Sequence, residues 1–302
     1  MSALDGFLNV YKPLGISSAG VVGRVKRMLP RGTAIGHGGT LDPEAEGVLP
    51  LCVGKATRLF DYIVDKQKRY IAEVTLGKVT DTQDAAGTVL EERPVRVGEA
   101  EIRAALPQLT GDILQRPPLY SALKRDGKPL YAYARKGQEI AVAPRPVRVD
   151  ALELLGCTGE NRYEIRVDCG KGVYVRTLMH DLGALLGCGG YMSRLTRVRA
   201  GAFRAEDAIA LDALSDVEAH LLPLDFPIGH IPLVRVGEGE LRRVQNGNPL
   251  YARSLLEAPQ AREGIVRVYV GDAFAGMGEF QEDGSVRFRA MLLEKGYECV
   301  SR

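Results

Sequence analysis

Two stretches of the chain alternate apolar and polar side chains. Every second residue from Tyr70 to Leu76 is apolar, and the residues between them are mostly polar. Residues 163–169 alternate in the same way. This period of two is typical of strands that bury one face. We therefore predict a strand over each stretch, with Tyr70 on the apolar side of the first.

Five other stretches place apolar residues at helical spacing. They are residues 19–29, 54–63, 99–106, 130–136 and 174–185. The first follows Ser17 and Ser18, which can cap free N–H groups, and stops at Pro30, which cannot continue a helix. The last carries Arg176 in its first turn. Residues 32–47 are rich in glycine and predict a loop.

The pattern changes near residues 223–232, where three prolines and a glycine suggest a linker. Beyond it, residues 265–270 and 285–291 have the pattern of strands, and Asp283-Gly284 suits a hairpin turn. A chain of 302 residues usually divides into domains. We predict a first domain over residues 1–228 and a small, barrel-like, β-rich domain over residues 229–302.

The composition, 45% apolar and 26% charged residues, is that of an ordinary globular protein. No apolar run approaches the roughly 20 residues of a membrane span, and residues 1–8 lack the pattern of a secretory signal. The five cysteines form no Cys-x-x-Cys pair, and the four histidines do not fall at metal-ligand spacings. We therefore expect a cytoplasmic protein without a disulfide framework or a metal site.

The net charge is only +2, but basic residues gather between positions 116 and 148. Eight basic and two acidic residues there leave a local excess of +6, eight minus two. The basic residues are Arg116, Lys124, Arg125, Lys128, Arg135, Lys136, Arg145 and Arg148. Such a patch can neutralise several phosphates of a nucleic acid. On charge alone, a solvated surface loop explains it equally well.

Residues 36–47 hold the most informative polar groups. Five of these twelve residues are glycine or proline. Pro43 disfavours helical backbone at Asp42, which restricts how the carboxylate is presented. Asp42 is therefore a candidate catalytic group, although a turn in which it binds its own backbone is the alternative. His37 is either a turn residue or an aromatic face that stacks on a nucleic-acid base.

Tyr70 and Arg176 each allow two interpretations. Tyr70 is a core residue of its strand or a platform for a flipped base, since stacking stabilises a base by about 1–3 kcal/mol. Arg176 is an exposed helix residue or the partner that keeps an active-site carboxylate ionised and oriented. Spacing alone does not pair Arg176 with Asp42, which lies 134 positions away.

Other catalytic motifs are missing from the sequence. It has no Gly-x-Ser-x-Gly elbow and no P-loop. Asp42 and Glu44 offer the paired carboxylates that a glycosidase needs, but a pair so close on one loop is unspecific. Nothing in the sequence requires a cofactor.

Taken in order, these features resemble the TruB family of bacterial tRNA pseudouridine-55 synthases. Six motifs carry the resemblance, which covers nearly the whole chain. They are residues 8–18, 36–49, 68–70 with 76–77 and 80–84, 117–124, 172–178, and 195–197 with 201–203. Each motif alone is weak, but six in the right order are specific.

The chain departs from the family pattern at three places. Gly38 stands where the family usually has threonine, and Ser18-Ala19 replaces its more usual serine-histidine pair. Arg116 stands before the double proline where an apolar residue is common. These departures bear on local loop geometry and not on the residues assigned to chemistry.

The resemblance implies an α+β fold: a mixed, mainly antiparallel sheet with flanking helices, and a small PUA-like RNA-binding C-terminal domain. It implies that the N1–C1′ bond of uridine 55 in the tRNA T-loop is broken and rejoined through C5, after the base is flipped out. No cofactor is needed, because no atom is added or removed. The implied partner is the T-arm of tRNA; we expect a monomer that needs neither a protein partner nor a membrane.

The resemblance also implies a role for each candidate residue. Asp42 is the catalytic carboxylate, as nucleophile or as base. Arg176 orients it, and Tyr70 stacks on the base and assists removal of the C5 proton. His37 holds the T-loop open, and Leu195 is an apolar wall of the pocket. An RNA-gripping insert of about residues 117–148 clamps the T-arm through Lys124, Arg125, Lys128, Arg135 and Arg145.

Two rival functions stay open on the sequence. One is a non-catalytic tRNA-folding or RNA-binding protein on the same fold. The other is a hydrolase that uses Asp42 with Glu44 or Glu46.

Overall fold

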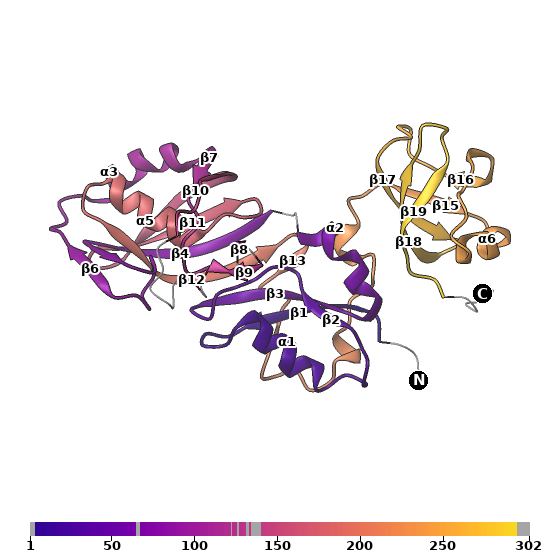
Figure 1. The fold of residues 1–302 in the computed structure, drawn as a ribbon, viewed down its shortest axis with the longest axis horizontal. Coiled ribbons are helices and arrows are strands. Elements are labelled where there is room, and N and C mark those ends of the chain that lie inside the picture. Colours follow the sequence, from indigo (N-terminus) through magenta and orange to yellow (C-terminus); the bar gives the residue numbers. More distant parts are fainter. Residues whose placement is uncertain are drawn as a thin grey trace.

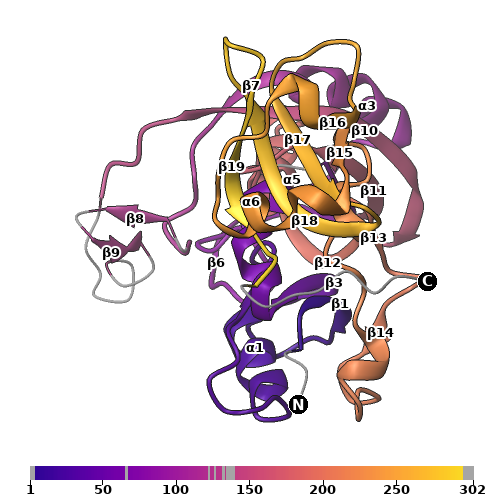
Figure 2. The same ribbon diagram turned by 90° about the vertical axis from the view of Figure 1, so that its right-hand side faces the viewer.

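The computed structural model describes residues 4–64, 67–121, 123–125, 127–130, 133 and 140–294. Figure 1 shows two unequal parts in a row, a large part built on a long sheet and a small β-rich part at one end. Figure 2 shows the small part from its own end, with the short hairpin of β8 (Lys124–Arg125) and β9 (Lys128–Pro129) projecting from the side of the molecule. The α+β prediction is confirmed.

Within the described residues, ten strands form the large sheet, in the order β14-β1-β3-β12-β4-β11-β10-β7, with β2 on β3 and β13 on β12. Their bounds are β1 (Gly6–Lys12), β2 (Ile35–His37), β3 (Ala45–Val53), β4 (Lys68–Leu76), β7 (Gly111–Gln115), β10 (Arg145–Gly159), β11 (Arg162–Cys169), β12 (Gly190–Ala200), β13 (Phe203–Arg204) and β14 (Ile209–Ala210). All pairs are antiparallel except β1 with β14 and β3 with β12. The sheet is therefore mixed and mainly antiparallel, as predicted.

Helices flank the sheet because their apolar stripes need a face to cover. They are α1 (Ser18–Lys26), α2 (Phe60–Val64), α3 (Glu99–Ala105) and α5 (Val175–Leu185). One core cluster lies between α3, α5 and strands β4, β10, β11 and β12, and a second lies between α1 and strands β1 and β3. Strands β5 (Lys78–Thr80) and β6 (Val89–Glu92) form a separate ribbon.

The predicted helices are largely present. The stretch 54–63 is a 3-10 turn, η1 (Gly54–Leu59), that runs into α2, and α3 runs into a second one, η2 (Leu106–Leu109). The helix after Ser17 ends earlier than predicted, at Lys26. Most of the predicted helix 130–136 lies outside the described residues.

The glycine-rich loop is shorter than the sequence suggested. Residues 35–37 form β2 and residues 45–53 form β3, so residues 32–34 and 38–44 are what remains of the predicted loop. We did not predict β3 because nearly all of its side chains are buried, and a strand covered on both faces does not alternate. Residues 38–44 therefore connect two strands that pair with each other, β2 and β3, and this pairing fixes both ends of the loop.

The small part is a sheet of five strands in the described range, in the order β16-β15-β17-β18-β19. The strands are β15 (Leu233–Val236), β16 (Leu255–Glu257), β17 (Ile265–Val270), β18 (Ala273–Phe280) and β19 (Val286–Met291), with the short helix α6 (Leu241–Gln245). Strands β15 and β17 run parallel, and β17, β18 and β19 are antiparallel neighbours. The β-rich C-terminal part is therefore confirmed.

Candidate active site

The loop that carries Asp42 is fixed at its centre by Ser18. The Ser18 hydroxyl donates to the Leu41 carbonyl over 2.9 Å and accepts from the Leu41 N–H over 2.8 Å. Ser18 is buried at the start of α1, so the helix carries the anchor. A turn follows, in which the Ala45 N–H donates to the Asp42 carbonyl. The backbone on either side of Asp42 is thus bonded.

Lys12 ties the end of β1 to the same loop. Its side chain is fully buried, and its ammonium donates to the carbonyls of Pro13, Ile16 and Pro43. Burial lowers the pKa of Lys12 to about 8, against the attraction of Glu44 and Asp42, which raises it. The motif at residues 8–18 therefore supports the Asp42 loop through hydrogen bonds to its backbone.

Arg197 supports the loop from β12. Its side chain is fully buried, and it donates to the carbonyls of Val48 (2.7 Å), Gly39 (3.0 Å) and Thr40 (3.4 Å). Gly47 must lack a side chain here, because a Cβ would lie 2.3 Å from the Arg197 carbonyl oxygen. A buried guanidinium that satisfies three carbonyls fixes the shape of the loop.

The structure pairs the two residues that spacing alone could not. Arg176 Nη2 lies 2.9 Å from Asp42 Oδ2. The Arg176 side chain is only 5% exposed, so it is not the surface residue of the alternative interpretation, whereas the Asp42 side chain is 38% exposed. The Asp42 carboxylate is therefore oriented from one side and open on the other.

A second carboxylate holds Arg176. Asp84 Oδ2 lies 3.3 Å from Arg176 Nη1, and Nη1 also faces the Thr82 carbonyl at 3.5 Å. Arg176 Nη2 donates in addition to the Tyr120 carbonyl over 2.7 Å. The sequence reasoning did not assign Asp84 a role, although Asp84 lies in a motif of the resemblance. The guanidinium thus has fixed partners besides Asp42.

Burial raises the pKa of Asp42 above its ordinary value. The nearby Arg176 opposes this rise, Asp84 and Glu44 add to it, and Lys12 opposes it. The carboxylate is thus poorly solvated for a charged group. Such a carboxylate is more basic than one in water.

Tyr70 and Leu195 form the wall of a pocket beside Asp42. They lie on the neighbouring strands β4 and β12, and each is less than a tenth exposed. The pocket has a volume of about 340 Å³. It is lined by Thr40, Leu41, Asp42, Tyr70, Ser121, Leu123, Val173, Tyr174, Val175, Arg176, Met192 and Leu195. Burial raises the pKa of Tyr70, so its ring is neutral at neutral pH.

A second hollow, about 560 Å³, adjoins the first at Asp42. His37 lines it together with Ser17, Ala19 and Glu44, and Asp42 and Arg176 line both hollows. Burial lowers the pKa of His37, and the charge of Arg197 lowers it further, so the imidazole is held neutral. A neutral ring suits stacking better than ion pairing.

Among the predicted RNA-binding basic residues whose side chains the structure describes, Lys128 and Arg145 do not line these two hollows. Lys124 and Lys128 belong to the β8–β9 hairpin, and Lys128 is exposed. Arg145 is exposed and begins β10, where it pairs with Gln115 of β7 in the large sheet. Arg135 lies outside the described residues, as do the side chains of Lys124 and Arg125.

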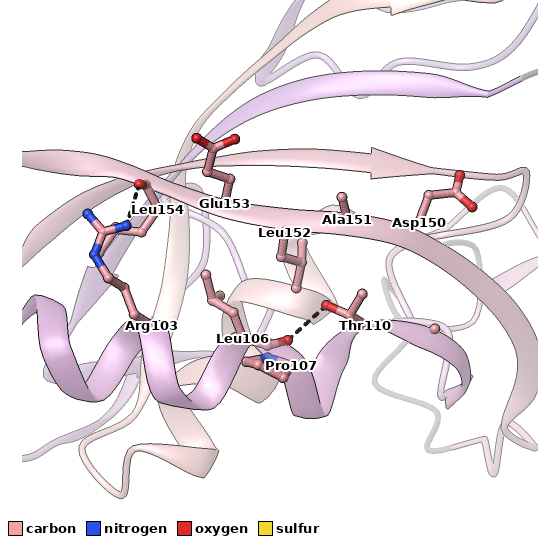
Figure 3. A pocket seen from close by; sticks show the side chains of 10 residues that line it. Arg103, Leu106, Pro107, Thr110, Asp150, Ala151, Leu152, Glu153 and Leu154 are labelled. Carbon is pink, nitrogen blue, oxygen red and sulfur yellow. Dashed lines mark hydrogen bonds between the residues drawn. The ribbon is translucent and has the colours of Figure 1, made fainter.

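A further hollow of about 600 Å³ lies between α3, η2 and β10 (Figure 3). Arg103 reaches across it and donates to the Leu154 carbonyl, as the dashed line in the figure marks. Its lining shares no residue with the two hollows around Asp42. We therefore place the candidate site at Asp42.

Over the described ranges, no cluster of three or more His, Cys, Asp or Glu side chains is arranged to hold a metal ion. Over the same ranges, every helix is too short or too polar to cross a membrane.

Three consecutive stretches of the chain match known families. Residues 26–175 match the N-terminal domain of TruB family pseudouridylate synthases. Residues 176–226 match the tRNA pseudouridylate synthase B C-terminal domain, and residues 232–292 match the C-terminal region of pseudouridine synthase II TruB.

Curated relatives match over nearly their whole length. The tRNA pseudouridine synthase B of Aromatoleum aromaticum is 46% identical over 288 residues, which cover 94% of this chain and 91% of the relative. The tRNA pseudouridine synthase B of Pseudomonas fluorescens strain Pf0-1 is 42% identical over 299 residues, 96% of each chain. Among solved structures, a chain of a Cbf5-Nop10-Gar1 complex superposes with a TM-score of 0.72 and 27% identity over 96% of this chain and 84% of that one.

Proposed function

Because the chain belongs to the TruB family and is a tRNA pseudouridine synthase, an isomerase, we propose that it converts uridine 55 in the T-loop of tRNA to pseudouridine, with Asp42 as its catalytic carboxylate. One observation carries the proposal. Asp42 lies 2.9 Å from a buried arginine, at the meeting point of two hollows. One hollow suits a flipped base and the other suits the loop that the base has left.

The reaction breaks the C1′–N1 bond and forms a C1′–C5 bond on the same base. The C5 proton leaves to solvent and N1 gains a proton, so atoms and charge balance without a cofactor. Asp42 acts in its ionised form, as nucleophile at C1′ or as base toward the sugar. Its raised pKa makes it a stronger base and nucleophile than a solvated aspartate.

Arg176 serves the reaction by orienting Asp42. Its guanidinium donates to Asp42 from a buried position, where a charge-assisted bond is stronger than in water. Asp84 and the Tyr120 carbonyl fix the guanidinium before substrate arrives. Preorganisation of this kind avoids a reorientation of charged groups during the reaction.

Tyr70 and Leu195 receive the flipped uracil. A pocket of about 340 Å³ falls in the range of small-ligand sites, and its wall at these residues is apolar. Stacking on the Tyr70 ring offsets part of the cost of unstacking the base from the T-loop. Tyr70 also assists removal of the C5 proton, because it lines the same pocket as Asp42.

The T-arm is held outside the base pocket. His37 enters the T-loop from the second hollow and keeps it open. The exposed basic residues Lys128 and Arg145, with Lys124, Arg125 and Arg135, neutralise phosphates of the T-arm. Residues 1–228 then form the catalytic domain and residues 229–302 the RNA-binding one, and the enzyme works as a cytoplasmic monomer.

The test is tritium release from a T-arm stem-loop labelled at C5 of its uridines. The protein should release tritium from the target uridine, and a matched RNA with cytidine at that position should release none. RNA binding without release would remove the synthase proposal for this substrate and leave a non-catalytic RNA-binding protein.

A further inference from the structure

Gln83 has the conformation of a strained residue next to the site. Its φ is +66°, in the left-handed region that favours glycine, and glutamine adopts it at a cost. Gln83 and Asn161 are the non-glycine residues with positive φ among the described residues. Strain of this kind persists only where surrounding contacts impose it.

The contacts that impose it are specific. The Gln83 carbonyl accepts from the Met192 N–H of β12 over 3.0 Å. The Gln83 side-chain oxygen accepts from the Thr177 hydroxyl over 2.7 Å. Thr177 is 3% exposed and follows Arg176 in the first turn of α5. Gln83 thus joins its loop to both the sheet and the helix that bears Arg176.

The two neighbours of Gln83 both reach Arg176. The Thr82 carbonyl and the Asp84 carboxylate face the same guanidinium nitrogen, Nη1, at 3.5 and 3.3 Å. The Thr82 hydroxyl also donates to Asp84 Oδ1 over 2.5 Å. The left-handed backbone between them lets a carbonyl and a carboxylate two residues apart converge on one atom.

We infer that Gln83 is a positioning residue for the reaction: through its bond to Thr177 it fixes Thr82 and Asp84 on Arg176, and so fixes Arg176 on Asp42. Gln83 lines neither of the two hollows around Asp42, so it acts through these residues and not on the RNA. The inference rests on the proposed function, because Asp42 must be the reacting carboxylate.

The hydrogen bond between Gln83 and Thr177 can be removed by substitution of either residue. Gln83→Ala removes the acceptor and Thr177→Val removes the donor, while Thr177→Ser keeps the hydroxyl. Gln83→Ala and Thr177→Val are each expected to lower kcat about tenfold. KM and RNA affinity should stay within about twofold of wild type. Thr177→Ser should keep most of the wild-type kcat. Because Gln83→Ala and Thr177→Val both remove this bond, the double variant should be no slower than either single one.

A pH profile separates positioning from general stability. The charged groups that face Asp42 come from four elements. They are Arg176 on α5, Asp84 on the loop of Gln83, Glu44 on the Asp42 loop and Lys12 on β1. Arg176 lowers the pKa of Asp42, so a loosened Arg176 should move the acid limb of kcat to higher pH. A variant that is only less stable melts earlier but keeps the wild-type limb.

The outcomes divide cleanly. A lowered kcat, a shifted acid limb and non-additive effects support the role of Gln83. An unchanged kcat, additive effects or a change confined to KM overturns it. Absence of tritium release from wild-type protein, with RNA bound, overturns the proposed function instead and is recognised before any variant is compared.

Discussion

At the scale of single residues, Asp42 combines exposure to the pocket with poor solvation. Its side chain is 38% exposed and touches the one guanidinium that orients it. Burial still raises its pKa from the ordinary value of 3.8, because the rest of its surroundings do not replace water fully. The raised pKa of Asp42 should affect both the pH dependence of the rate and the stability of the fold.

The first concerns the pH dependence of the rate. In the proposed mechanism Asp42 acts in its ionised form, so kcat/KM should fall as pH decreases through its raised pKa. The acid limb is therefore expected above pH 3.8, where a solvated aspartate is still ionised. Lysine in place of Arg176 cannot hold Asp42 and Asp84 with two separate nitrogens, as Nη2 and Nη1 do. This substitution should therefore move the acid limb to still higher pH. An acid limb at or below 3.8 in a steady-state pH profile contradicts the burial argument.

The second concerns stability. A carboxyl whose pKa is raised by folding favours the folded state below its unfolded pKa, and that stability is lost as pH rises through the folded pKa. Ionised Asp42 therefore opposes folding at neutral pH. Asp42→Asn is expected to melt at a higher temperature than wild type at pH 7, with the gain shrinking as pH falls toward 3.8. A lower melting temperature at pH 7 in calorimetry argues against this sign.

Gly38 shows how a departure from the family pattern fits this chain. A Cβ at Gly38 would lie 2.9 Å from Cδ1 of Ile63 and 3.4 Å from Cβ of Pro50. A threonine would therefore displace Ile63, which belongs to a buried cluster. The glycine therefore avoids the clash that a threonine would make with its neighbours.

At the scale of elements, the Asp42 loop takes its shape from three neighbours. Helix α1 supplies Ser18, β1 supplies Lys12 and β12 supplies Arg197. Each donates to or bonds the backbone of residues 39–43 and not the Asp42 side chain. The carboxylate therefore stays available for chemistry while its backbone is fixed.

Ser17, the N-cap of α1, and Ser18, its first residue, offer a matched test of this anchoring. Ser17 caps the helix by accepting from the Gly20 N–H, and Ser18 bonds both backbone groups of Leu41. Ser17→Ala should cost about 1 kcal/mol of stability. Because Ser17 lines the second hollow, any effect of the change on RNA should appear in KM and not in kcat. Ser18→Ala should cost about 1–3 kcal/mol and lower kcat as well, because buried groups lose their partner and the loop loosens. Equal kcat values for the two variants would exclude an anchoring role for Ser18.

The sequence predicted the elements whose patterns are local. The strand of Tyr70 alternates and the helix of Arg176 has a clear apolar stripe, so both were found. Strand β3 is buried throughout, and β2 is three residues long, so neither has a local pattern. The supports Lys12, Arg197 and Asp84 were not assigned, because their roles come from contacts between residues far apart in the chain.

At the scale of the whole molecule, the segment between the two sheets is packed and not free. Ile228 is fully buried, and the ring of Phe226 contacts that of Phe203 at 5.5 Å between centroids. On the other side, the Tyr269 hydroxyl of β17 donates to Asp225 over 2.5 Å. The linker predicted from its prolines is thus packed against both parts, with Pro227 and Ile228 buried at its centre.

Removal of one hydroxyl tests this packing. Tyr269→Phe leaves the ring in place but removes the hydrogen bond that the hydroxyl donates to Asp225. It is expected to cost about 1–2 kcal/mol and to speed proteolysis in residues 223–232, with kcat on a T-arm RNA unchanged. Tyr251→Phe, an exposed tyrosine in the same part, is the control. Equal cleavage rates of the two variants would show that the bond does not hold this segment.

The most direct test of the central claim compares wild type with Asp42→Asn. Both proteins are given T-arm RNA labelled with tritium at C5 of uridine, and RNA binding is measured in parallel. We expect the variant to bind RNA as tightly as wild type and to release tritium slower by a factor on the order of 10⁴ or more. Release by the variant at a rate within tenfold of wild type would contradict the assignment of Asp42 as the catalytic carboxylate.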